Sequence, residues 1–571
     1  MPKANELIVR VLEEAGVEVV FGLPGGGTGA IFDILYDHQD KIRTYLVRHE
    51  QNAAIMADAY GRATGKPAVI MGQGVFMGSN ASFGIMEACL SSSPMLVLTD
   101  TSDGNMAQRA ANQSGAGEYA SIDLLSIFRA MTKYTTLAAQ PKEAVIGAQV
   151  ALKHALSGRP GPACVLMRSS SIVGEVNLES PPFIHPTRGH LNTAKPIAPP
   201  REVERAAKLL AQARSPVIVA GQGARLSGAG ALVSELAETL GAPVATTYKG
   251  KSAVAETSPW AVGMVGVYGQ RAANIAVGEA DVVLVVGAKL TPQDTVRERP
   301  QVFDPKRQKI IQIDIEERNA GWTFPVESGL VGDARAIMEQ LREALRPMAP
   351  KPGEREQRRS ALQQAKAKAA YYDGDPALAR DSSPVTPQRL VRLLQESLDP
   401  ETLITLDAGN NRTWMAHLYR SQRPDTFFAP GGMAGMGWAL PAALGLQVAR
   451  PETPVVAVSG DGGYMMTIHA LSTAVQYKLP VVSVVMNDSA LGMVRQHQAT
   501  RLIASEFVDT DFAALARGFG VHGIRVRDSQ ELPKAIREAQ ALGKPAVIDV
   551  VTDRGPSPDD FRADRRGATE T

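Results

Sequence analysis

The sequence predicts an α/β protein with three doubly wound parallel-sheet domains. Helical patterns alternate with short buried-strand patterns in three separate stretches, which is typical of parallel sheets covered by helices. Two segments rich in proline or charge separate these stretches, and 571 residues suit three or four domains. We therefore expect domains at 1–173, 201–346 and 387–554, linkers at 174–200 and 347–386, and a tail at 555–571.

Composition excludes several classes of protein. The 60 basic and 59 acidic residues give a net charge of +1, so neither nucleic acid nor an anionic membrane is an expected partner. No apolar run reaches membrane-spanning length, and the chain starts as an amphipathic helix rather than a signal peptide. The only cysteines, Cys89 and Cys164, have apolar neighbours and are expected to be core thiols. A soluble protein of the reducing cytoplasm fits these features.

The first stretch alternates regularly between the two patterns. We expect helices at 7–14, 29–35, 51–63 and 81–92, and strands at 19–21, 44–47, 68–71 and 95–99. The glycine-rich segment 22–29 lacks the Lys-Ser/Thr pair of a P-loop and the spacing of a dinucleotide fingerprint. It therefore predicts a turn from strand to helix.

The second and third stretches repeat this alternation. In the second we expect strands at 217–220, 244–246, 282–286 and 310–313 and a helix at 231–240. In the third, strands at 454–458 and 481–486 flank a helix at 465–475 that shows no breaker. A right-handed crossover would make these two strands parallel neighbours or near neighbours.

Polar residues follow both strands of that third unit. Asp461 and Asn487 stand just beyond the carboxyl ends of the strands, the edge where open α/β sheets bind ligands. A carboxylate and an amide oxygen are donors that Mg²⁺ accepts when it also holds phosphates. Three glycines would let backbone N–H groups approach an anion at the helix start: Gly460, Gly462 and Gly463. The alternative is a crossover whose turns happen to need glycine and asparagine.

A resemblance favours the metal site. Gly460-Asp461-Gly462, followed by 24 residues and Asn487, resembles the GDG…N signature of enzymes that depend on thiamine diphosphate (ThDP). In that family the Asp, the Asn and a backbone carbonyl two residues after the Asn, here that of Ser489, hold Mg²⁺ on the cofactor diphosphate. The resemblance is to the acetolactate synthase type, covers about residues 4–552, and implies a pyrimidine-binding, a middle and a pyrophosphate-binding domain in that order.

Glu50 is the catalytic residue that this resemblance implies. It lies after a strand and at the start of a helix, in the segment RHEQNAAIMADAYGRATG, which resembles the family segment with its catalytic acid. The carboxyl group would bind a nitrogen of the cofactor's aminopyrimidine, and burial would keep its pKa high enough for proton exchange. Without the resemblance, Glu50 would be interpreted as an acidic residue in the first helical turn, where the helix dipole favours a negative charge.

The resemblance also assigns the remaining cofactor contacts and the assembly. Met436 would be the apolar wedge under the bent cofactor. The other expected cofactor contacts are Gly409, Asn410, Asn411, Gly435, Ala490, Leu491, Gly492 and Met493, besides the motif residues already named. Family sites combine the first domain of one subunit with the third domain of another, which implies a homodimer at minimum and a homotetramer as the expected form.

The substrate side departs from the synthase pattern. The expected pocket residues are Gly25, Gly26, Phe76, Gln113, Tyr119, Lys133, Val494 and His497. Phe76 and its neighbours add bulk where synthases have a Gly-Pro-Gly turn, and Tyr119-Ala120 replaces a Phe-Gln pair. His497 stands where synthases commonly have Trp; it is either a polar specificity residue or a surface histidine. Lys133 would meet a substrate carboxylate or is a solvated lysine.

The middle domain resembles the FAD-binding part of synthases at 263–274, so FAD or ADP is an expected ligand, with an empty site as the alternative. The expected activity is ThDP- and Mg²⁺-dependent formation or cleavage of a C–C bond next to a carbonyl of a 2-oxo acid, with a carboligase as the leading form. The alternatives are a 2-hydroxyacyl-CoA or oxalyl-CoA lyase, a 1,2-diketone hydrolase, and an inactive nucleotide-binding regulator.

Overall fold

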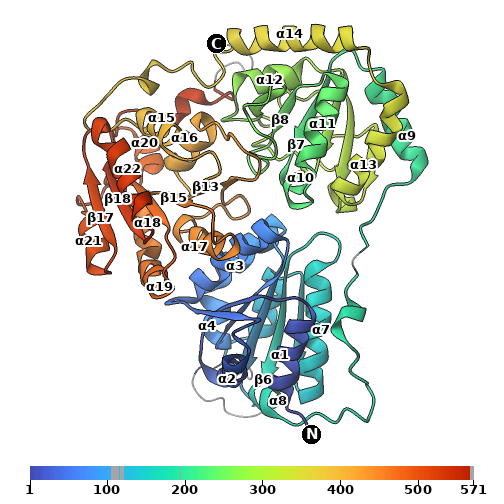
Figure 1. Ribbon diagram of the computed structural model, residues 1–571, viewed down its shortest axis with the longest axis vertical. Helices are drawn as coiled ribbons and strands as arrows, with labels where there is room; N and C mark the ends of the chain where they lie inside the picture. The colour runs from blue at the N-terminus through green and yellow to red at the C-terminus, as the bar shows by residue number, and fades with distance from the viewer. Residues whose placement is uncertain (104–112, 114, 116–120, 193, 566–571) are drawn as a thin grey trace.

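Three parallel six-stranded sheets, each with helices on both sides, form the molecule, which confirms the predicted fold class. The computed structural model describes all residues except 104–112, 114, 116–120, 193 and 566–571. Figure 1 shows the first domain in blue and cyan at the bottom, the middle domain in green, and the third in orange and red. None of the described helices is long and apolar enough to cross a membrane.

The first sheet has the strand order β2-β1-β3-β4-β6-β5. Its strands are β1 (Val19–Leu23), β2 (Arg43–Leu46), β3 (Ala68–Gly72), β4 (Met95–Thr101), β5 (Tyr134–Ala138) and β6 (Pro162–Arg168). Its helices are α1 (Ala4–Glu14), α2 (Gly29–Leu35), α3 (Glu50–Thr64), α4 (Gly74–Ser79), α5 (Ser82–Ser91), α6 (Leu124–Met131), α7 (Pro141–Leu156) and α8 (Ser169–Val173). The glycine-rich segment is a turn with one 3-10 helix, Gly26–Thr28, as predicted.

The middle sheet has the order β12-β11-β10-β7-β8-β9. Its strands are β7 (Pro216–Ala220), β8 (Val244–Thr246), β9 (Ala261–Met264), β10 (Val282–Val286), β11 (Lys309–Asp314) and β12 (Ser328–Val331). Its helices are α9 (Pro200–Ala211), α10 (Gln222–Leu226), α11 (Gly230–Leu240), α12 (Arg271–Gly278) and α13 (Ala334–Leu345). The long charged helix α14 (Pro352–Lys368) then leads toward the third domain, along the top of Figure 1.

The third sheet has the order β14-β13-β15-β16-β18-β17. Its strands are β13 (Leu403–Leu406), β14 (Phe427–Phe428), β15 (Val455–Gly460), β16 (Val482–Asn487), β17 (His522–Val526) and β18 (Ala546–Val551). Its helices are α15 (Pro387–Ser397), α16 (Asn410–Leu418), α17 (Ala439–Ala449), α18 (Asp461–Thr467), α19 (Leu471–Gln476), α20 (Gly492–Gln498), α21 (Phe512–Gly518) and α22 (Leu532–Ala541).

One prediction about this domain was wrong. The helix expected at 465–475 is two short helices, α18 and α19, separated by a 3-10 turn over Ile468–Ala470. The turn places the His469 ring 5.6 Å from the His49 ring of the first domain. The interruption therefore lets this stretch contact the first domain. Helical spacing in the sequence does not reveal such a contact between domains.

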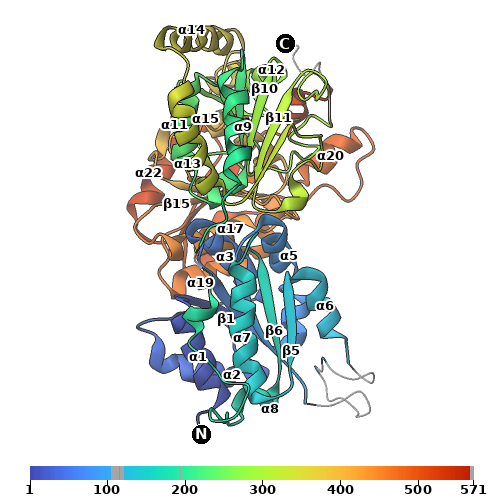
Figure 2. The ribbon, with the colours of Figure 1, turned by 90° about the vertical axis from the view of Figure 1, so that its right-hand side faces the viewer.

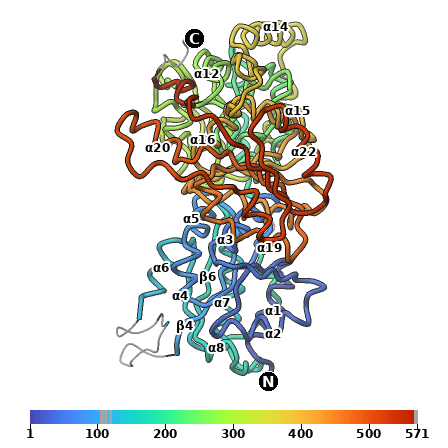
Figure 3. Tube along the Cα trace, turned by 90° about the vertical axis from the view of Figure 1, so that its left-hand side faces the viewer, coloured from blue at the N-terminus to red at the C-terminus, as the bar shows by residue number. Residues whose placement is uncertain are grey.

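The first and third domains share one hydrophobic core. Helix α3 of the first domain packs on α17 of the third, in the centre of Figures 1 and 2. The shared cluster includes Ile55 and Tyr60 from α3 and Leu440 and Leu444 from α17, all at most 1% exposed. Figure 3 shows the same contact from the side opposite to that of Figure 2, between the blue and orange segments. The two helices thus join the first domain, with its expected catalytic segment, to the third domain, with the expected cofactor segments.

Candidate functional site

Asp461 and Asn487 lie at neighbouring strand ends in the third sheet. Strands β15 and β16 pair in parallel with Gly460 opposite Met486, which confirms the predicted neighbour relation. Asn487 is the last residue of β16, and Asp461 is the first residue of α18, directly after β15. Both side chains therefore lie at the carboxyl edge of the sheet.

The amide of Asn487 is held in one orientation. Its Nδ2 donates to the carbonyl of Thr510 and to Oδ1 of Asp549, both at 2.9 Å. Its Oδ1 accepts only long hydrogen bonds from Ser489, at 3.3 Å from N and 3.4 Å from Oγ. An amide fixed through its nitrogen presents its oxygen as a donor to a hard cation.

The carboxylate of Asp461 lacks a compensating cation among the described residues. It is 4% exposed and accepts from the backbone N–H of Gly462 at 2.7 Å and of Ala490 at 3.2 Å. Burial and the charge of Asp488 raise its pKa to about 7. A divalent cation would offset both effects, so the donor set fits Mg²⁺.

The Ser489 carbonyl fits the expected metal site less directly. It already accepts from the backbone N–H of Phe507 at 2.8 Å and from Nη2 of Arg554 at 3.2 Å. Coordination would therefore require Arg554 to release it. The described residues include no group of three or more His, Cys, Asp or Glu side chains that could hold a metal ion. A metal here would therefore depend on amide and carbonyl oxygens besides the Asp461 carboxylate.

A second segment brings polar groups to the same edge. Gly409, with a positive φ of 108°, precedes α16, and the side-chain oxygens of Asn410 and Asn411 are buried without a hydrogen-bond partner. Nδ2 of Asn410 donates to Gln496 of α20 at 3.0 Å. A Cβ placed on Gly492 would lie 3.1 Å from Asn410 Nδ2, and one on Gly460 would lie 3.2 Å from Asn411 Nδ2. The backbone N–H groups at the start of α16 fit a bound anion such as a diphosphate. The two unpaired amide oxygens are acceptors, so they fit a cation or a hydrogen-bond donor instead.

Met436 extends over the same glycines. Its Cε lies 3.2 Å from the place where a Cβ on Gly462 would be, so the predicted wedge and the predicted metal motif are adjacent. Leu491 Cδ2 lies at 3.1 Å from that same point. On its carboxyl side, Met436 is followed by Gly437 and Trp438, whose N–H groups both donate to the buried Asp407. Burial raises the pKa of Asp407 to about 7.

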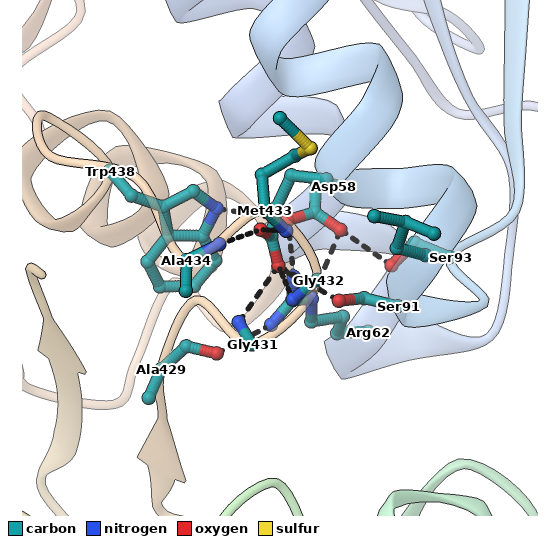
Figure 4. Close-up of polar contacts among 12 residues, drawn as sticks. Asp58, Arg62, Ser91, Ser93, Ala429, Gly431, Gly432, Met433, Ala434 and Trp438 are labelled. Carbon is teal, nitrogen blue, oxygen red and sulfur yellow. Dashed lines mark hydrogen bonds and ion pairs between the residues drawn. The ribbon is translucent and has the colours of Figure 1, made fainter. Parts of the chain in front are cut away.

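A buried ionic network from the first domain holds the amino side of this segment (Figure 4). Arg62 bonds both carboxylate oxygens of Asp58, at 3.0 and 2.7 Å, and Oε1 of Glu87 at 2.7 Å. Glu87 in turn accepts four backbone N–H groups from the third domain, those of Gly431, Gly432, Met433 and Ala434. Trp438 Nε1 donates to Asp58 at 2.9 Å, and the Arg62 guanidinium lies 4.8 Å from the Trp438 ring centroid.

Glu50 begins α3 and is 5% exposed. Its Oε2 accepts from Nδ2 of Asn80 at 2.9 Å, and no hydrogen bond joins Glu50 to the third domain within the described residues. The preceding residue, His49, caps the helix by accepting from the backbone N–H of Gln51 at 3.3 Å. Glu50 is thus buried and positioned by its own domain, while the groups expected to hold metal and diphosphate lie on another.

Asp100 organises the glycines of the expected substrate side. It is 6% exposed and accepts from the backbone N–H of Gly27 at 2.6 Å and of Gly74 at 2.8 Å. A Cβ on Gly26, which has a φ of +56°, would lie 2.2 Å from Asp100 Oδ2. Gly25 lies beside Gln73, whose Nε2 donates to Gln113 Oε1 at 2.9 Å. Gly25, Gly26 and Gln113 are therefore brought together at the carboxyl edge of the first sheet.

The other expected pocket residues are spread more widely. Phe76 is half-buried in α4, and Tyr119 lies outside the described residues. On α20, Val494 is 44% exposed, and His497 Nδ1 is bonded to the carbonyl of Met493 at 2.6 Å. Lys133 precedes β5, at the edge of the first sheet opposite to Glu50, and its Nζ donates to the carbonyls of Ser157 and Arg159. Within the described residues, neither Lys133 nor His497 is hydrogen-bonded to Glu50, whose side chain bonds Asn80.

A cavity of about 680 Å³ lies where the three domains meet. Three middle-domain segments line it: the turn after β7, the segment after β9, which belongs to the FAD-type stretch 263–274, and the segment after β10. Its cationic side chains are Arg159, Lys195, Lys249, Lys289 and Arg412, and its acidic ones are Asp294, Asp314 and Asp333. This excess of positive charge fits an anionic ligand.

Comparisons with known proteins agree with this geometry. Models of the N-terminal, central and C-terminal domains of thiamine pyrophosphate enzymes match residues 2–120, 203–341 and 407–550. A probable acetolactate synthase large subunit of Methanocaldococcus jannaschii is 34% identical over 96% of this chain and 92% of its own. The chain belongs to the thiamine pyrophosphate enzyme family. The resemblance inferred from the GDG motif is thereby confirmed, thiamine pyrophosphate being another name for ThDP.

Bacterial proteins similar to this thiamine pyrophosphate enzyme are also acetolactate synthase large subunits. The acetolactate synthase isozyme 3 large subunit of Escherichia coli is 32% identical over 94% of this chain and 92% of its own. The acetolactate synthase large subunit of Corynebacterium glutamicum is 30% identical over 95% and 86%. The similarity thus extends through all three domains.

Several residues that shape the site are not among those predicted from the sequence: Asp58, Arg62, Glu87, Asp100 and Asp407. A signal exists for three of them. Asp58 and Arg62 stand four residues apart on α3, the spacing of a helical ion pair, and Glu87 is a charge within the apolar run of α5. Their common role as a support for a loop more than 340 residues away follows only from the fold.

Proposed function

We propose that the protein is a ThDP- and Mg²⁺-dependent carboligase of the acetolactate synthase type that acts on 2-oxo acids. The observation that carries this proposal is the convergence at Gly460–Gly463. There, the Asp461 carboxylate, the Asn487 amide oxygen with its two long hydrogen bonds, and the tip of Met436 come from three separate segments to one sheet edge.

The residues have distinct roles in this proposal. ThDP, when bound, supplies a cationic thiazolium ring that takes up electrons as a bond next to a carbonyl breaks. Asp461 and Asn487 would hold Mg²⁺, and the start of α16 would bind the diphosphate. Glu50 would exchange a proton with a ring nitrogen of the aminopyrimidine. Met436 would support the cofactor from its apolar side.

The relatives favour a carboligase over the CoA lyase, diketone hydrolase and regulatory alternatives, since those reported are acetolactate synthases. The test is to incubate the protein, ThDP and Mg²⁺ with pyruvate and other 2-oxo acids, and to measure CO₂ release and coupled products. We expect both with the wild type and neither with Glu50→Gln. Absence of turnover with every 2-oxo acid, despite bound ThDP, would reject the decarboxylating carboligase.

We further propose that two chains complete each site. Glu50 makes no hydrogen bond to the metal-binding groups within the described part of one chain. Near those groups, α18 exposes Met465 (44%) and Met466 (55%), the kind of surface that subunit contacts cover. A homodimer that pairs the first domain of one chain with the third domain of the other would bring both halves together.

Mixing two inactive variants tests this assembly. Suppose that each site takes Glu50 from one chain and Asp461 from the other. A heterodimer of one Glu50→Gln chain and one Asp461→Ala chain then has one intact site. Random exchange of a 1:1 mixture would then restore about a quarter of wild-type activity, because about half of the C2 dimers are mixed. No recovery, with mixed dimers demonstrated by native mass spectrometry, would place the whole site within one chain.

The cavity between the domains is proposed to bind FAD or ADP with a structural role. Its supporting features are its size, its excess of cationic side chains and the glycines Gly223 and Gly287 in its lining. Lys249 lines it, and its side chain forms no hydrogen bond or ion pair within the described residues. Burial and the nearby charge of Arg62 lower the pKa of Lys249 to about 8. A negatively charged ligand would supply the missing partner.

A further inference from the structure

Met436 lies between two carboxylates that bind the backbone on either side of it. Asp407, from its own domain, accepts the N–H groups of residues 437 and 438. Glu87, from the first domain, accepts those of residues 431–434. We propose that Glu87 is a positioning residue that sets the location of Met436, and through it the geometry of the bound cofactor. This inference rests on the proposed function.

The four hydrogen bonds of Glu87 fix the loop firmly. Oε1 accepts from Gly431 at 3.0 Å and Gly432 at 2.9 Å, and Oε2 accepts from Met433 at 2.7 Å and Ala434 at 3.0 Å. The side chain is fully buried, so these bonds do not compete with water. Hydrogen bonds to a charged acceptor are roughly twice as strong as those between neutral groups.

The first domain holds Glu87 itself just as firmly. Arg62 donates to Oε1 at 2.7 Å, and Ser91, one helical turn further along α5, donates to the same oxygen at 2.8 Å. Asp58 fixes the other side of Arg62 and also accepts from Ser93 and from the Trp438 indole. The carboxylate is therefore part of a rigid frame, and the loop must conform to it.

The short chain between the anchor and Met436 transmits its position. Only Gly435 separates Ala434 from Met436, and each residue spans at most about 3.6 Å. Ala434 has a φ of +54°, and a Cβ on Gly435 would lie 2.5 Å from Phe83 of the first domain. The segment thus has little freedom, and a shift of Ala434 would shift Met436.

The test compares Glu87→Gln with a matched control, Glu256→Gln. Glu256 is also fully buried, bonds Lys251 at 2.8 Å and accepts from Ser421 N at 2.7 Å, but it joins the middle and third domains away from Met436. Both variants leave a buried cation without its full charge partner, so both should unfold at lower urea concentration. For each protein we measure ThDP binding by calorimetry and C2 proton exchange in D₂O by NMR, with saturating ThDP and Mg²⁺.

Glu87→Gln is expected to slow C2 exchange by about tenfold or more at saturating ThDP, since a displacement of about 1 Å can cost about 100-fold. Glu256→Gln should stay within about twofold of wild type. Exchange within twofold of wild type in both variants, or equal slowing in both, would overturn the inference.

Two further outcomes are decisive. If Glu87→Gln does not fold, Ser91→Ala, which removes one donor to Glu87, decides instead: slower exchange supports the inference and unchanged exchange overturns it. Wild-type protein that binds no ThDP and shows no exchange would reject the proposed function itself. Failure of the function and failure of the inference are therefore distinguished by the wild-type sample.

Discussion

At the scale of single residues, Asp549 sets the orientation of the proposed metal ligand Asn487. Its Oδ1 accepts from Asn487 Nδ2 at 2.9 Å, and its Oδ2 accepts from the backbone N–H of Phe512 at 3.1 Å. Without this carboxylate the amide could rotate and present its nitrogen. We expect Asp549→Ala to weaken Mg²⁺ activation by about 10- to 100-fold, as loss of groups that orient a metal ligand typically does.

The control for this prediction is Asp511→Ala. Asp511 lies 3.7 Å from Arg525, close to the 3.5 Å between Asp549 and Arg525. Within the described residues, however, the Asn487 amide nitrogen bonds Thr510 and Asp549 and not Asp511. The Mg²⁺ concentration for half-maximal activity should rise in Asp549→Ala and stay near wild type in Asp511→Ala. Equal Mg²⁺ requirements in the two variants would show that Asp549 does not orient the ligand.

Glu87 also predicts a pH dependence of stability. Burial raises its pKa, but the charge of Arg62 and the N–H groups of Gly431 and Gly432 outweigh burial and lower the pKa to about 2. A pKa below the ordinary 4.5 means that the folded state favours the ionised form. Its contribution, of the order of 3 kcal/mol, is present above about pH 4.5 and is lost as pH falls toward 2.

Urea unfolding between pH 3 and 6 measures this effect. The difference in free energy of unfolding between wild type and Glu87→Gln should be largest near pH 6 and should shrink as pH falls, because only the wild type loses the ionised carboxylate. A difference that stays constant over this range would contradict the low pKa.

At the scale of elements, the crossing of α3 and α17 joins the first and third domains. A Cβ placed on Gly445 of α17 would lie 2.3 Å from the carbonyl oxygen of Met56 on α3. Because that neighbour is backbone, the helices would have to separate. We expect Gly445→Ala to lower the free energy of unfolding by about 1–3 kcal/mol, the usual cost of overpacking, and to weaken ThDP binding.

Gly353→Ala is the reference for that substitution. Gly353 lies in the exposed helix α14, and a Cβ there would have no atom within 4 Å. The free energy of unfolding of Gly353→Ala should stay within about 1 kcal/mol of the wild-type value, since only helix propensity changes. If urea unfolding gives the same free energy of unfolding for Gly445→Ala and Gly353→Ala, the helices α3 and α17 have room to adjust.

Comparison of predicted and observed elements shows what the sequence determines locally. Strands such as 282–286 and the positions of Asp461 and Asn487 follow from apolar runs and the polar residues that end them. The 3-10 turn at Ile468–Ala470 and the Glu87 anchor depend on contacts between domains, which no local period encodes. Phe76 was expected to replace a turn with bulk, and the bulk is accommodated in the helix α4.

At the scale of the whole molecule, the cavity between the three domains is the proposed nucleotide site. Gly431 and Ala434, two of the residues bound by Glu87, line it together with Lys249. A Cβ on Gly431 would lie 2.3 Å from Lys249 Cδ, so this lysine packs directly on the anchored loop. A ligand in the cavity would therefore contact all three domains and resist their separation.

Binding of an anionic nucleotide should raise the unfolding temperature. A ligand that binds only the folded state, at about 100 times its Kd, adds about 2.7 kcal/mol. We expect FAD or ADP to raise the Tm of wild type, and Lys249→Met to raise the Kd for the nucleotide because a buried cation that faces the ligand is lost. Calorimetric titration with FAD, ADP and neutral riboflavin separates the contributions of phosphate charge and flavin ring. Equal affinity of wild type and Lys249→Met for all three compounds would show that Lys249 does not bind the anionic group.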